Sequence, residues 1–369
     1  MKITVLQDHL RSGGTERQSI LLCREFGVLG HAALLVTFRP GGRLAGPGPA
    51  RPLSLQSFDT GVDWFAPGLL RTVLGTAPDI VLCMGKTANC FAGRIQRRAS
   101  GGGLGTRVVA TLRAGGRLPW FYYSSVRRAA HVVANSREAA AELVSRHGFD
   151  PGRVSAIHNA LAFPASPGAR DEQLRAGLGA GPGSTVLLSV GMFRPEKNQR
   201  ALVEIAAGLR ADWDWRLWFL GDGPELARCA RLAARTGAAG RIRFLGFQPD
   251  PVAYYRAADI AVHASREEAL SNALIEAQSN GLPAVACQAL GIRECMVAGR
   301  TGFVVAQGDH EGFRAALARL ASDTPAERAE RAGEARAFAR GAFDPATQVG
   351  AHIGLFESLL RDTEPAPRP

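Results

Sequence analysis

The chain has 369 residues, which is too long for one ordinary α/β core and comfortable for two domains. Hydrophobic residues make up 46% and charged residues 21%, values that exclude general disorder and a membrane-embedded fold. The formal net charge of +11 suits phosphate-bearing ligands or an anionic membrane face, although an arginine-rich composition explains it equally well.

No apolar window approaches the roughly 20 residues that a membrane-spanning helix needs. Met1-Lys2 runs directly into Ile3 without the apolar stretch of a secretory signal, so we expect a cytoplasmic protein. No basic cluster interleaved with aromatic residues argues for nucleic acid. The six cysteines and eight histidines form no metal-ligand spacing, so we expect reduced, buried thiols, no metal and no cofactor.

Short β-branched or leucine-rich runs alternate with alanine-rich helical segments, which is typical of βαβ units and a parallel sheet. The expected strands are 2–6, 33–37, 80–84, 107–111, 131–134 and 154–157 in the first half, then 185–190, 216–220, 241–244, 260–263, 284–286 and 302–305 in the second. Each half therefore has enough strands for its own doubly wound sheet.

A stretch rich in Gly, Pro and Ala, residues 160–184, separates the two halves. We therefore expect an N-terminal domain over 1–165 and a C-terminal domain over 166–345. Residues 346–369 should form a helix that packs back toward the first domain and then a frayed, Pro-rich tail. Helices are expected over 311–320, 325–339 and 346–361.

In the second half, the residues from Gly191 to Asn198 follow a strand and open a helix. Backbone N–H groups and the helix dipole make such a turn an anion site. Lys197 stands at its mouth, where a mobile point charge can follow a diphosphate as it leaves. From this motif alone, a solvated turn lysine remains the simpler alternative.

Two glutamates, Glu268 and Glu276, flank the start of another helix. The preceding strand leads through a polar loop to Ser271 or Asn272, both good N-caps. Glu276 lies about one turn inside the helix, where a carboxylate can accept paired ribose hydroxyls. The backbone N–H groups of residues 270–272 would meet phosphate.

Glu268 and Glu276 together resemble the E-x7-E signature of the retaining GT-B glycosyltransferases of family 4, also called group 1. Further segments resemble the same family in the same order, namely 190–198, 220–225, 244–246, 254–259, 280–286, 291–294 and 301–305. The first half resembles the family more loosely. There the resemblance rests on residues 13–17, 134–136 and 158–160.

The resemblance implies an α/β, GT-B fold, in which two Rossmann-like, doubly wound parallel-sheet domains face each other across a cleft. It implies that Lys197 binds the donor diphosphate with help from Arg194, that Glu268 lies beside the transferring sugar, and that Glu276 binds the nucleotide ribose. It implies that Gly13 and Gly14 form a flexible loop that binds the donor, where the absence of a Cβ allows close approach to the phosphates. The other donor-binding residues that it implies are Gly191, Ala269, Leu270, Ser271 and Asn272.

Three positions depart from the family pattern. Met192 stands where many relatives have an arginine that pairs with the diphosphate lysine, and Arg194 is the nearest replacement. Residues 111–113, Thr-Leu-Arg, occupy the place of a histidine that is common near the donor sugar. Ala269 replaces the usual glycine, which slightly restricts the phosphate loop.

The resemblance implies retaining hexosyl transfer from a nucleotide diphosphate sugar, without a metal and by a front-face route. A UDP-sugar is favoured over a GDP-sugar, and the acceptor would be a glycan or lipid-linked glycan of the cell envelope. A lipid-linked acceptor would bring a peripheral contact with the inner face of the membrane. The candidate residues for that contact are Arg94, Arg97, Arg98, Arg127 and Arg128.

Three alternatives from other classes stay open. A nucleotide-sugar epimerase shares the double-Rossmann layout, and a catalytically silent sugar-nucleotide-binding protein would tolerate Met192 and the missing histidine. Hydride transfer is disfavoured, because no G-x-G-x-x-G segment leads from a strand into a helix with an acidic residue further on.

Overall fold

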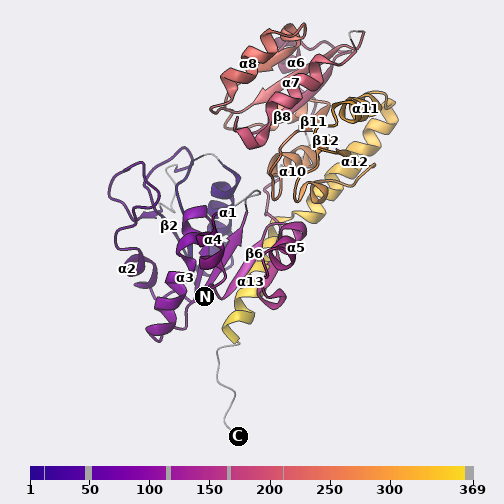
Figure 1. The fold of residues 1–369 in the computed structure, drawn as a ribbon. Coiled ribbons are helices and arrows are strands. Elements are labelled where there is room, and N and C mark those ends of the chain that lie inside the picture. Colours follow the sequence, from indigo (N-terminus) through magenta and orange to yellow (C-terminus); the bar gives the residue numbers. More distant parts are fainter. Residues whose placement is uncertain (12, 46–51, 114–117, 164–167, 211, 362–369) are drawn as a thin grey trace. The chain divides into compact units, whose positions relative to one another are not determined.

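The computed structural model describes residues 1–11, 13–45, 52–113, 118–163, 168–210 and 212–361 (Figure 1). Contacts between residues divide the chain into two units, which we describe one at a time. Unit 1 comprises Met1–Leu161 and Pro345–Pro369, and unit 2 comprises Ala162–Asp344. The tail expected to fray, residues 362–369, lies outside the described residues.

Unit 1 contains a seven-stranded, wholly parallel sheet in the order β3-β2-β1-β4-β5-β6-β7. Its strands are β1 (Lys2–Gln7), β2 (Ala32–Thr37), β3 (Leu53–Ser54), β4 (Ile80–Cys83), β5 (Arg107–Leu112), β6 (His131–Ala134) and β7 (Val154–Ala156). Its helices are α1 (Gly14–Val28), α2 (Leu69–Leu74), α3 (Lys86–Gly101), α4 (Trp120–Val126), α5 (Arg137–Ser145) and α13 (Pro345–Arg361), with the short 3-10 turn η1 (Pro151–Arg153).

Unit 2 contains a six-stranded, wholly parallel sheet in the order β10-β9-β8-β11-β12-β13. Its strands are β8 (Thr185–Val190), β9 (Trp215–Leu220), β10 (Ile242–Phe244), β11 (Ile260–His263), β12 (Ala284–Cys287) and β13 (Gly302–Val305). Its helices are α6 (Glu172–Gly177), α7 (Gln199–Ala207), α8 (Leu226–Ala234), α9 (Val252–Ala257), α10 (Asn272–Ser279), α11 (His310–Ala321) and α12 (Pro325–Ala342), with the 3-10 turns η2 (Pro195–Lys197), η3 (Ala239–Arg241) and η4 (Ile292–Cys295).

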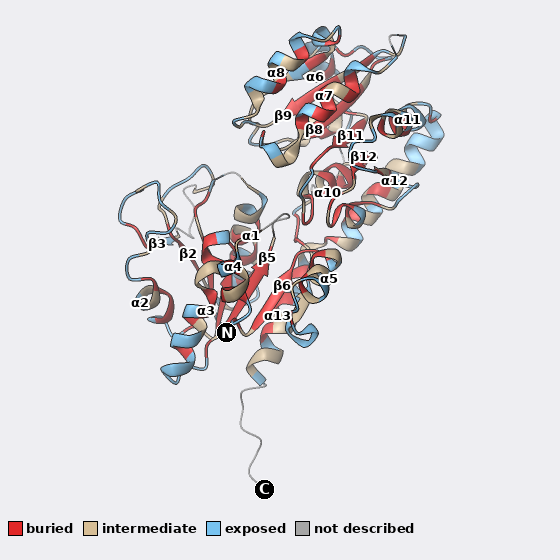
Figure 2. Cartoon of the chain, in the orientation of Figure 1, coloured by how far each residue is buried: buried red, intermediate tan, exposed pale blue. Residues whose placement is uncertain are grey.

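Every strand expected from the alternating pattern is present, with ends shifted by at most one residue. The sequence does not predict β3, because its two residues are too few to form a pattern and follow a segment rich in Gly and Pro. The three C-terminal helices are also confirmed, α12 reaching three residues beyond its expected end. Figure 2 shows why the patterns are strong: the strands of each sheet are buried, as strands covered on both faces must be.

The C-terminal helix α13 packs on unit 1. The Phe356 ring lies edge-on to Phe26 of α1, with 5.7 Å between the ring centroids, and both side chains are fully buried. Val349 joins the same hydrophobic core, which also includes strand residues such as Val5. The chain therefore returns to the first sheet after completing the second.

In both sheets the strand order reverses beside the first strand of the unit. In unit 2, the chain winds outward from β8 in one direction through β9 and β10, and in the other through β11, β12 and β13. Doubly wound sheets bind ligands beside the carboxyl ends of their strands at such a switch point. The loops after β8 and β11 therefore present the side chains of unit 2 that are best placed to meet a ligand.

The expected boundary segment, residues 160–184, is not wholly a linker. It contains α6, whose fully buried Arg175 side chain donates to Ala257 O at 2.6 Å and to Ser184 O at 2.7 Å. The same guanidinium lies 3.0 Å from Asp259 Oδ2. These bonds fix α6 to the segments that precede β8 and β11, at the edge of the sheet opposite the switch-point loops.

We expect Arg175→Leu to lower the free energy of unfolding of unit 2 by about 3 kcal/mol, because it leaves two buried carbonyl oxygens without their donor and removes one of the two cations that pair with Asp259. Arg170 also pairs with Asp259, at 2.7 Å, but its side chain is 38% exposed. Arg170→Leu is therefore the matched control, expected to change stability by about 1 kcal/mol or less. Urea unfolding followed by the fluorescence of the buried Trp215 and Trp218 measures both, and equal losses would contradict the assignment.

Candidate active site

Two loops meet at the switch point of unit 2. The strands that carry them, β8 and β11, are direct neighbours, with Leu187 opposite Ile260. The backbone N–H of Arg266 in the second loop donates to Glu196 O in the first at 2.8 Å. Main-chain bonding therefore fixes the register of the two loops before any side chain contributes.

Lys197 is the last residue of the 3-10 turn η2, and helix α7 begins two residues later. Between them, Asn198 adopts a left-handed conformation (φ 51°), which asparagine tolerates better than most residues. The expected turn between a strand and a helix is thus present, and it leaves the Lys197 side chain about one-quarter exposed.

Lys197 forms an ion pair with Glu268, which stands in the loop after β11. On its other side, Glu268 Oε2 lies 3.2 Å from Nε2 of His263, the last residue of β11. Burial would by itself raise the pKa of the Glu268 carboxyl, but the charge of Lys197 and the hydrogen bond from His263 outweigh it and lower the pKa to about 2. Burial lowers the pKa of His263, so an uncharged imidazole donates to an ionised carboxylate.

Helix α10 begins as the sequence predicts. Ser271 is its N-cap, and the Ser271 hydroxyl accepts a hydrogen bond from the backbone N–H of Leu274. Glu276 lies one turn inside, where its Oε2 is 3.0 Å from the hydroxyl of Tyr255 on α9. A hydroxyl bonded to one oxygen of the carboxylate orients the carboxylate plane before a ligand arrives.

The segment expected to form the phosphate loop is largely buried. Ala269 is fully buried, and Leu270 and Ser271 are nearly so. The backbone N–H of Ser271 points to the sulfur of Cys295 at 3.4 Å. A thiol is a weak acceptor, so this contact is one that an incoming oxyanion could replace.

Arg194, the second cation of the loop after β8, takes no part in the ion pair between Lys197 and Glu268. The Arg194 side chain is 44% exposed and approaches Glu196 at 3.8 Å. Met192, at the position where relatives have an arginine, accepts a bond from Gln199 through its carbonyl oxygen. No atom lies within 4 Å of where a Cβ on Gly191 would stand, so the space beside that glycine is open.

Gly13 and Gly14 begin a helix rather than a flexible loop, because Gly13 is the N-cap of α1 and Gly14 its first residue. At the same edge of unit 1, Thr111 is buried and its hydroxyl donates to Cys83 O at 2.8 Å, so it does not face a ligand. Arg113 follows β5 and donates to Asn159 Oδ1 at 2.6 Å. Burial lowers the pKa of Arg113 to about 10.

Sequence reasoning missed His263 and Tyr255 as partners of the two glutamates. His263 gave a usable signal, because a polar residue ends a strand in the middle of a buried parallel sheet. Tyr255 lies in the segment 254–259 that resembles the family, but the segment does not show that its hydroxyl reaches Glu276 from a helix that precedes β11. Only the packing of α9 against the loop and helix after β11 brings the two together.

Within the described residues, no three His, Cys, Asp or Glu side chains are grouped as a metal site. None of the described helices combines the length and the apolar character needed to cross a bilayer. The six cysteines are free thiols; all are buried except Cys90, which is half-buried. The expectation of unpaired thiols is thus confirmed.

The lowered pKa of Glu268 predicts a pH-dependent stability. The ionised carboxylate stabilises the fold above its ordinary pKa of 4.5, and this stabilisation is lost as the pH falls toward 2. Glu268→Gln should therefore lower the free energy of unfolding at pH 7, and its difference from wild type should shrink as the pH falls through that window. Urea titrations across the pH range measure it, with the exposed neighbour substituted as Glu267→Gln for control. A difference that does not change with pH would contradict the charge assignment.

Two family profiles match the chain over adjoining ranges. The one described as Glycosyltransferase Family 4 matches residues 12–162, and the one described as Glycosyl transferases group 1 matches residues 170–337. The first range falls almost wholly in unit 1 and the second in unit 2.

Curated relatives match parts of the chain. The lipopolysaccharide core biosynthesis glycosyltransferase LpsE of Rhizobium meliloti is 35% identical over 149 residues, which cover 40% of this chain and 43% of that protein. The D-inositol 3-phosphate glycosyltransferase 2 of Catenulispora acidiphila is 35% identical over 207 residues, covering 53% of this chain and 48% of that protein. The matched part therefore spans less than half the length of either relative.

Solved structures match nearly the whole chain. Anabaena Alr3699/HepE in complex with UDP and glucose has a TM-score of 0.81 at 22% identity, over 97% of this chain and 100% of that one. Sucrose-phosphate synthase from Thermosynechococcus elongatus has a TM-score of 0.81 at 17% identity, over 98% and 100%. At these identities the likeness establishes the fold, which is GT-B. The chain therefore belongs to the group 1, family 4 glycosyltransferases.

Proposed function

We propose that this glycosyltransferase moves a hexosyl group, with retention, from a UDP-sugar to a glycan or lipid-linked glycan of the cell envelope. The observation that carries the proposal is the arrangement at the switch point of unit 2. A lysine, an ionised glutamate and the capped start of α10 stand together there, with a second glutamate one turn inside the helix. Anabaena HepE, of the same fold, is solved with UDP and glucose, which supports UDP over GDP.

Donor binding exchanges one partner of Lys197 for another. Lys197 pairs with Glu268, and a diphosphate with two negative charges would compete for the same ammonium group. Glu268 keeps its bond to His263 when Lys197 turns away, and this bond holds the Glu268 carboxyl group in place. It is then free to accept hydrogen bonds from hydroxyls of the transferring sugar.

Catalysis in this scheme is electrostatic. Negative charge grows on the leaving diphosphate while the anomeric carbon gains oxocarbenium character, and Lys197 and the N–H groups at the start of α10 stabilise it. Arg194 can add a second cation, because the exposed ion pair that holds it to Glu196 is weak. Gly13 and Gly14 would let the start of α1 approach the donor phosphates without a Cβ in the way.

We further propose that transfer follows a front-face route and needs no metal. The departing phosphate oxygen would accept the proton of the acceptor hydroxyl, so neither Glu268 nor Glu276 acts as a glycosidase-type nucleophile. Glu268 suits a spectator role, since it is held ionised between a cation and an imidazole. The charge that a metal would supply falls to Lys197 and Arg194.

The acceptor class rests on relatives. LpsE is named for lipopolysaccharide core biosynthesis, and the Catenulispora acidiphila relative is named a D-inositol 3-phosphate glycosyltransferase. An envelope glycan carried on a lipid agrees with the first and with the positive charge of the chain.

Lys197→Ala should lower kcat/KM for the UDP-sugar by at least about 100-fold, because it removes one stabiliser of the leaving group. The control is Arg200→Ala, which removes a cation from the adjacent helix α7 where it pairs only with Glu204 on the exposed face. Steady-state donor turnover measures both. A Lys197→Ala variant with wild-type turnover would overturn the mechanism, and a wild type that binds UDP-sugars without turnover would favour a silent binder.

Tyr255→Phe should weaken UDP binding about fivefold, the effect of losing one hydrogen bond that orients the Glu276 carboxylate. Glu276→Gln should weaken it more, because the ribose hydroxyls lose a charged acceptor. Calorimetric titration with UDP measures the binding affinity independently of catalysis. Tyr254→Phe, on the neighbouring residue of α9, should leave the affinity unchanged, and an equal effect there would argue against a ribose site at Glu276.

A further inference from the structure

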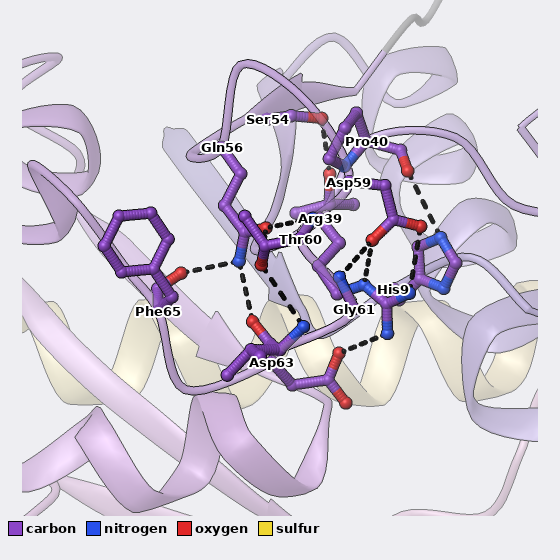
Figure 3. A network of polar contacts seen from close by, with 12 residues as sticks. His9, Arg39, Pro40, Ser54, Gln56, Asp59, Thr60, Gly61, Asp63 and Phe65 are labelled. Atoms are coloured by element: carbon purple, nitrogen blue, oxygen red, sulfur yellow. Dashed lines mark hydrogen bonds and ion pairs between the residues drawn. The ribbon is translucent and has the colours of Figure 1, made fainter.

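The loop over residues 56–65 of unit 1 is organised around one buried amide side chain. Gln56, which is 2% exposed, donates to Val62 O at 2.8 Å and to Phe65 O at 2.6 Å, and its Oε1 accepts from the hydroxyl of Thr60 at 2.8 Å. Figure 3 shows the amide of Gln56 inside the loop and the Phe65 ring directed away from the network. One buried amide therefore holds the loop closed.

Ion pairs neutralise the acidic residues of this loop. Arg39 binds Asp59 through two nitrogens, at 2.6 and 2.9 Å, and reaches Asp63 at 3.1 Å (Figure 3). Arg11 binds the other oxygen of Asp63 at 2.9 Å. No acidic charge of the loop is thus left uncompensated.

The same loop holds apolar side chains in water. Phe58 is 72% exposed, Trp64 52%, Phe65 53% and Val62 50%. A loop that buries its amide and exposes its aromatic rings has the reverse of the usual polarity, and its hydrogen bonds make that arrangement a fixed one. Exposed apolar groups gathered in this way mark interaction sites.

Ring contacts extend this surface to α4. The Trp64 ring lies 5.8 Å from Phe121, which lies 6.2 Å from Trp120, and Trp120 is 79% exposed. We call these exposed residues the aromatic patch: Phe58, Val62, Trp64, Phe65, Trp120 and Phe121. Among the described residues, every exposed large hydrophobic side chain lies in unit 1, so the patch does not reflect a general looseness of the fold.

A basic groove adjoins the patch on α4. It has a volume of about 600 Å³ and is lined by Trp120, Tyr123, Ser124, Arg127, Arg128 and His147. Arg127 donates to His147 O and Arg128 to Ser124 O, both carbonyl oxygens. None of the ion pairs among the described residues involves either arginine. Arg94, Arg97 and Arg98 are exposed on α3, which packs against α4 through Gly93 and Ser125.

The net charge of the chain is concentrated in the same unit. Unit 1 contains 22 lysines and arginines against 12 aspartates and glutamates, so it contributes +10 of the total +11. Unit 2 is close to neutral. The net positive charge and the exposed aromatic side chains therefore both belong to unit 1. The described part of unit 2 has almost no net charge and no exposed large hydrophobic side chain.

We propose that the aromatic patch and the basic groove dock unit 1 on a bilayer that contains anionic lipids. Tryptophan and arginine are the residues that settle at the interface between headgroups and acyl chains. Phe58, Trp64 and Phe65 are each more than half exposed, which favours insertion into a bilayer over binding of a saccharide. The uncompensated arginines favour it over a second, equally basic copy of the chain. The proposal rests on the proposed function only in that a lipid-linked acceptor gives the contact a purpose.

The test is co-sedimentation of the full chain with vesicles of phosphatidylcholine and phosphatidylglycerol, compared with vesicles of phosphatidylcholine alone. Wild type should partition onto the anionic vesicles. Arg127→Gln combined with Arg128→Gln should lower the partition coefficient by about tenfold or more, as the loss of two interfacial cations requires. Trp64→Ser combined with Trp120→Ser should lower it by a similar factor. Arg231→Gln combined with Arg235→Gln, on the exposed face of α8 in unit 2, is the matched control and should bind as wild type does.

Lipids brominated along their acyl chains locate the contact. They should quench the fluorescence of Trp64 and Trp120 but not that of the buried Trp215 and Trp218, so the quenching should disappear in the Trp64→Ser, Trp120→Ser variant. Phe58→Ser gives an independent variant should that pair fold poorly. Wild-type binding by the tryptophan variant, or no preference for anionic vesicles, would overturn the proposal. The proposal would also be overturned if wild type were a dimer and the tryptophan variant a monomer, because the patch would then bind a second copy of the chain.

Turnover without vesicles keeps the two proposals separate. Both variant pairs lie outside the candidate active site, so their hydrolysis of the UDP-sugar in solution should equal that of wild type. Loss of vesicle binding with intact turnover in the variants supports the docking surface. A wild type that binds vesicles but turns over no nucleotide sugar would refute the proposed function and leave the docking surface standing.

Discussion

The ion pair between Lys197 and Glu268 joins two loops that are distant in sequence but adjacent at the switch point of a parallel sheet. The Glu268 side chain is largely buried, so its negative charge needs a partner, and the one-quarter-exposed Lys197 supplies it. Each holds the other in a position that a diphosphate and a sugar can take over. The rest of unit 2, from the buried strands to the capped helix α10, serves to bring those two side chains to one point.

Much of this arrangement was predictable, because parallel strands buried on both faces leave unmistakable apolar runs. The twelve expected strands and the N-cap at Ser271 follow from local pattern alone. The edge strand β3 has no pattern, and α6 looked like a linker because its glycine and proline neighbours hide Arg175. A single buried arginine decides that α6 belongs to unit 2, and no periodicity reports such a contact.

The charged residues of the candidate site were predictable from the sequence, but the side chains that bond to them were not. Lys197, Glu268 and Glu276 could be named from motif spacing, because each stands at a strand end or a helix start. His263 and Tyr255 reach the two glutamates across the fold, and only packing shows this. Gly13 and Gly14 were expected in a loop, yet a helix can begin at glycine when no side-chain cap is needed. The sequence identified the arginines on α3 and just after α4, but it did not predict the aromatic patch. Most of its aromatic side chains stand in a loop, where no periodic pattern shows whether a side chain is buried or exposed.

Almost all of the net charge lies in unit 1, so the two units attract ligands by different kinds of electrostatic interaction. A long-range field acts through the sum of many charges and fades within about 10 Å in ordinary salt, whereas a single buried contact is screened little. Under the proposed function, the nearly neutral unit 2 binds its nucleotide through local geometry around one lysine, whereas the proposed docking surface of unit 1 depends on the salt concentration. A change in ionic strength would then alter where the enzyme resides without altering how well it recognises its donor.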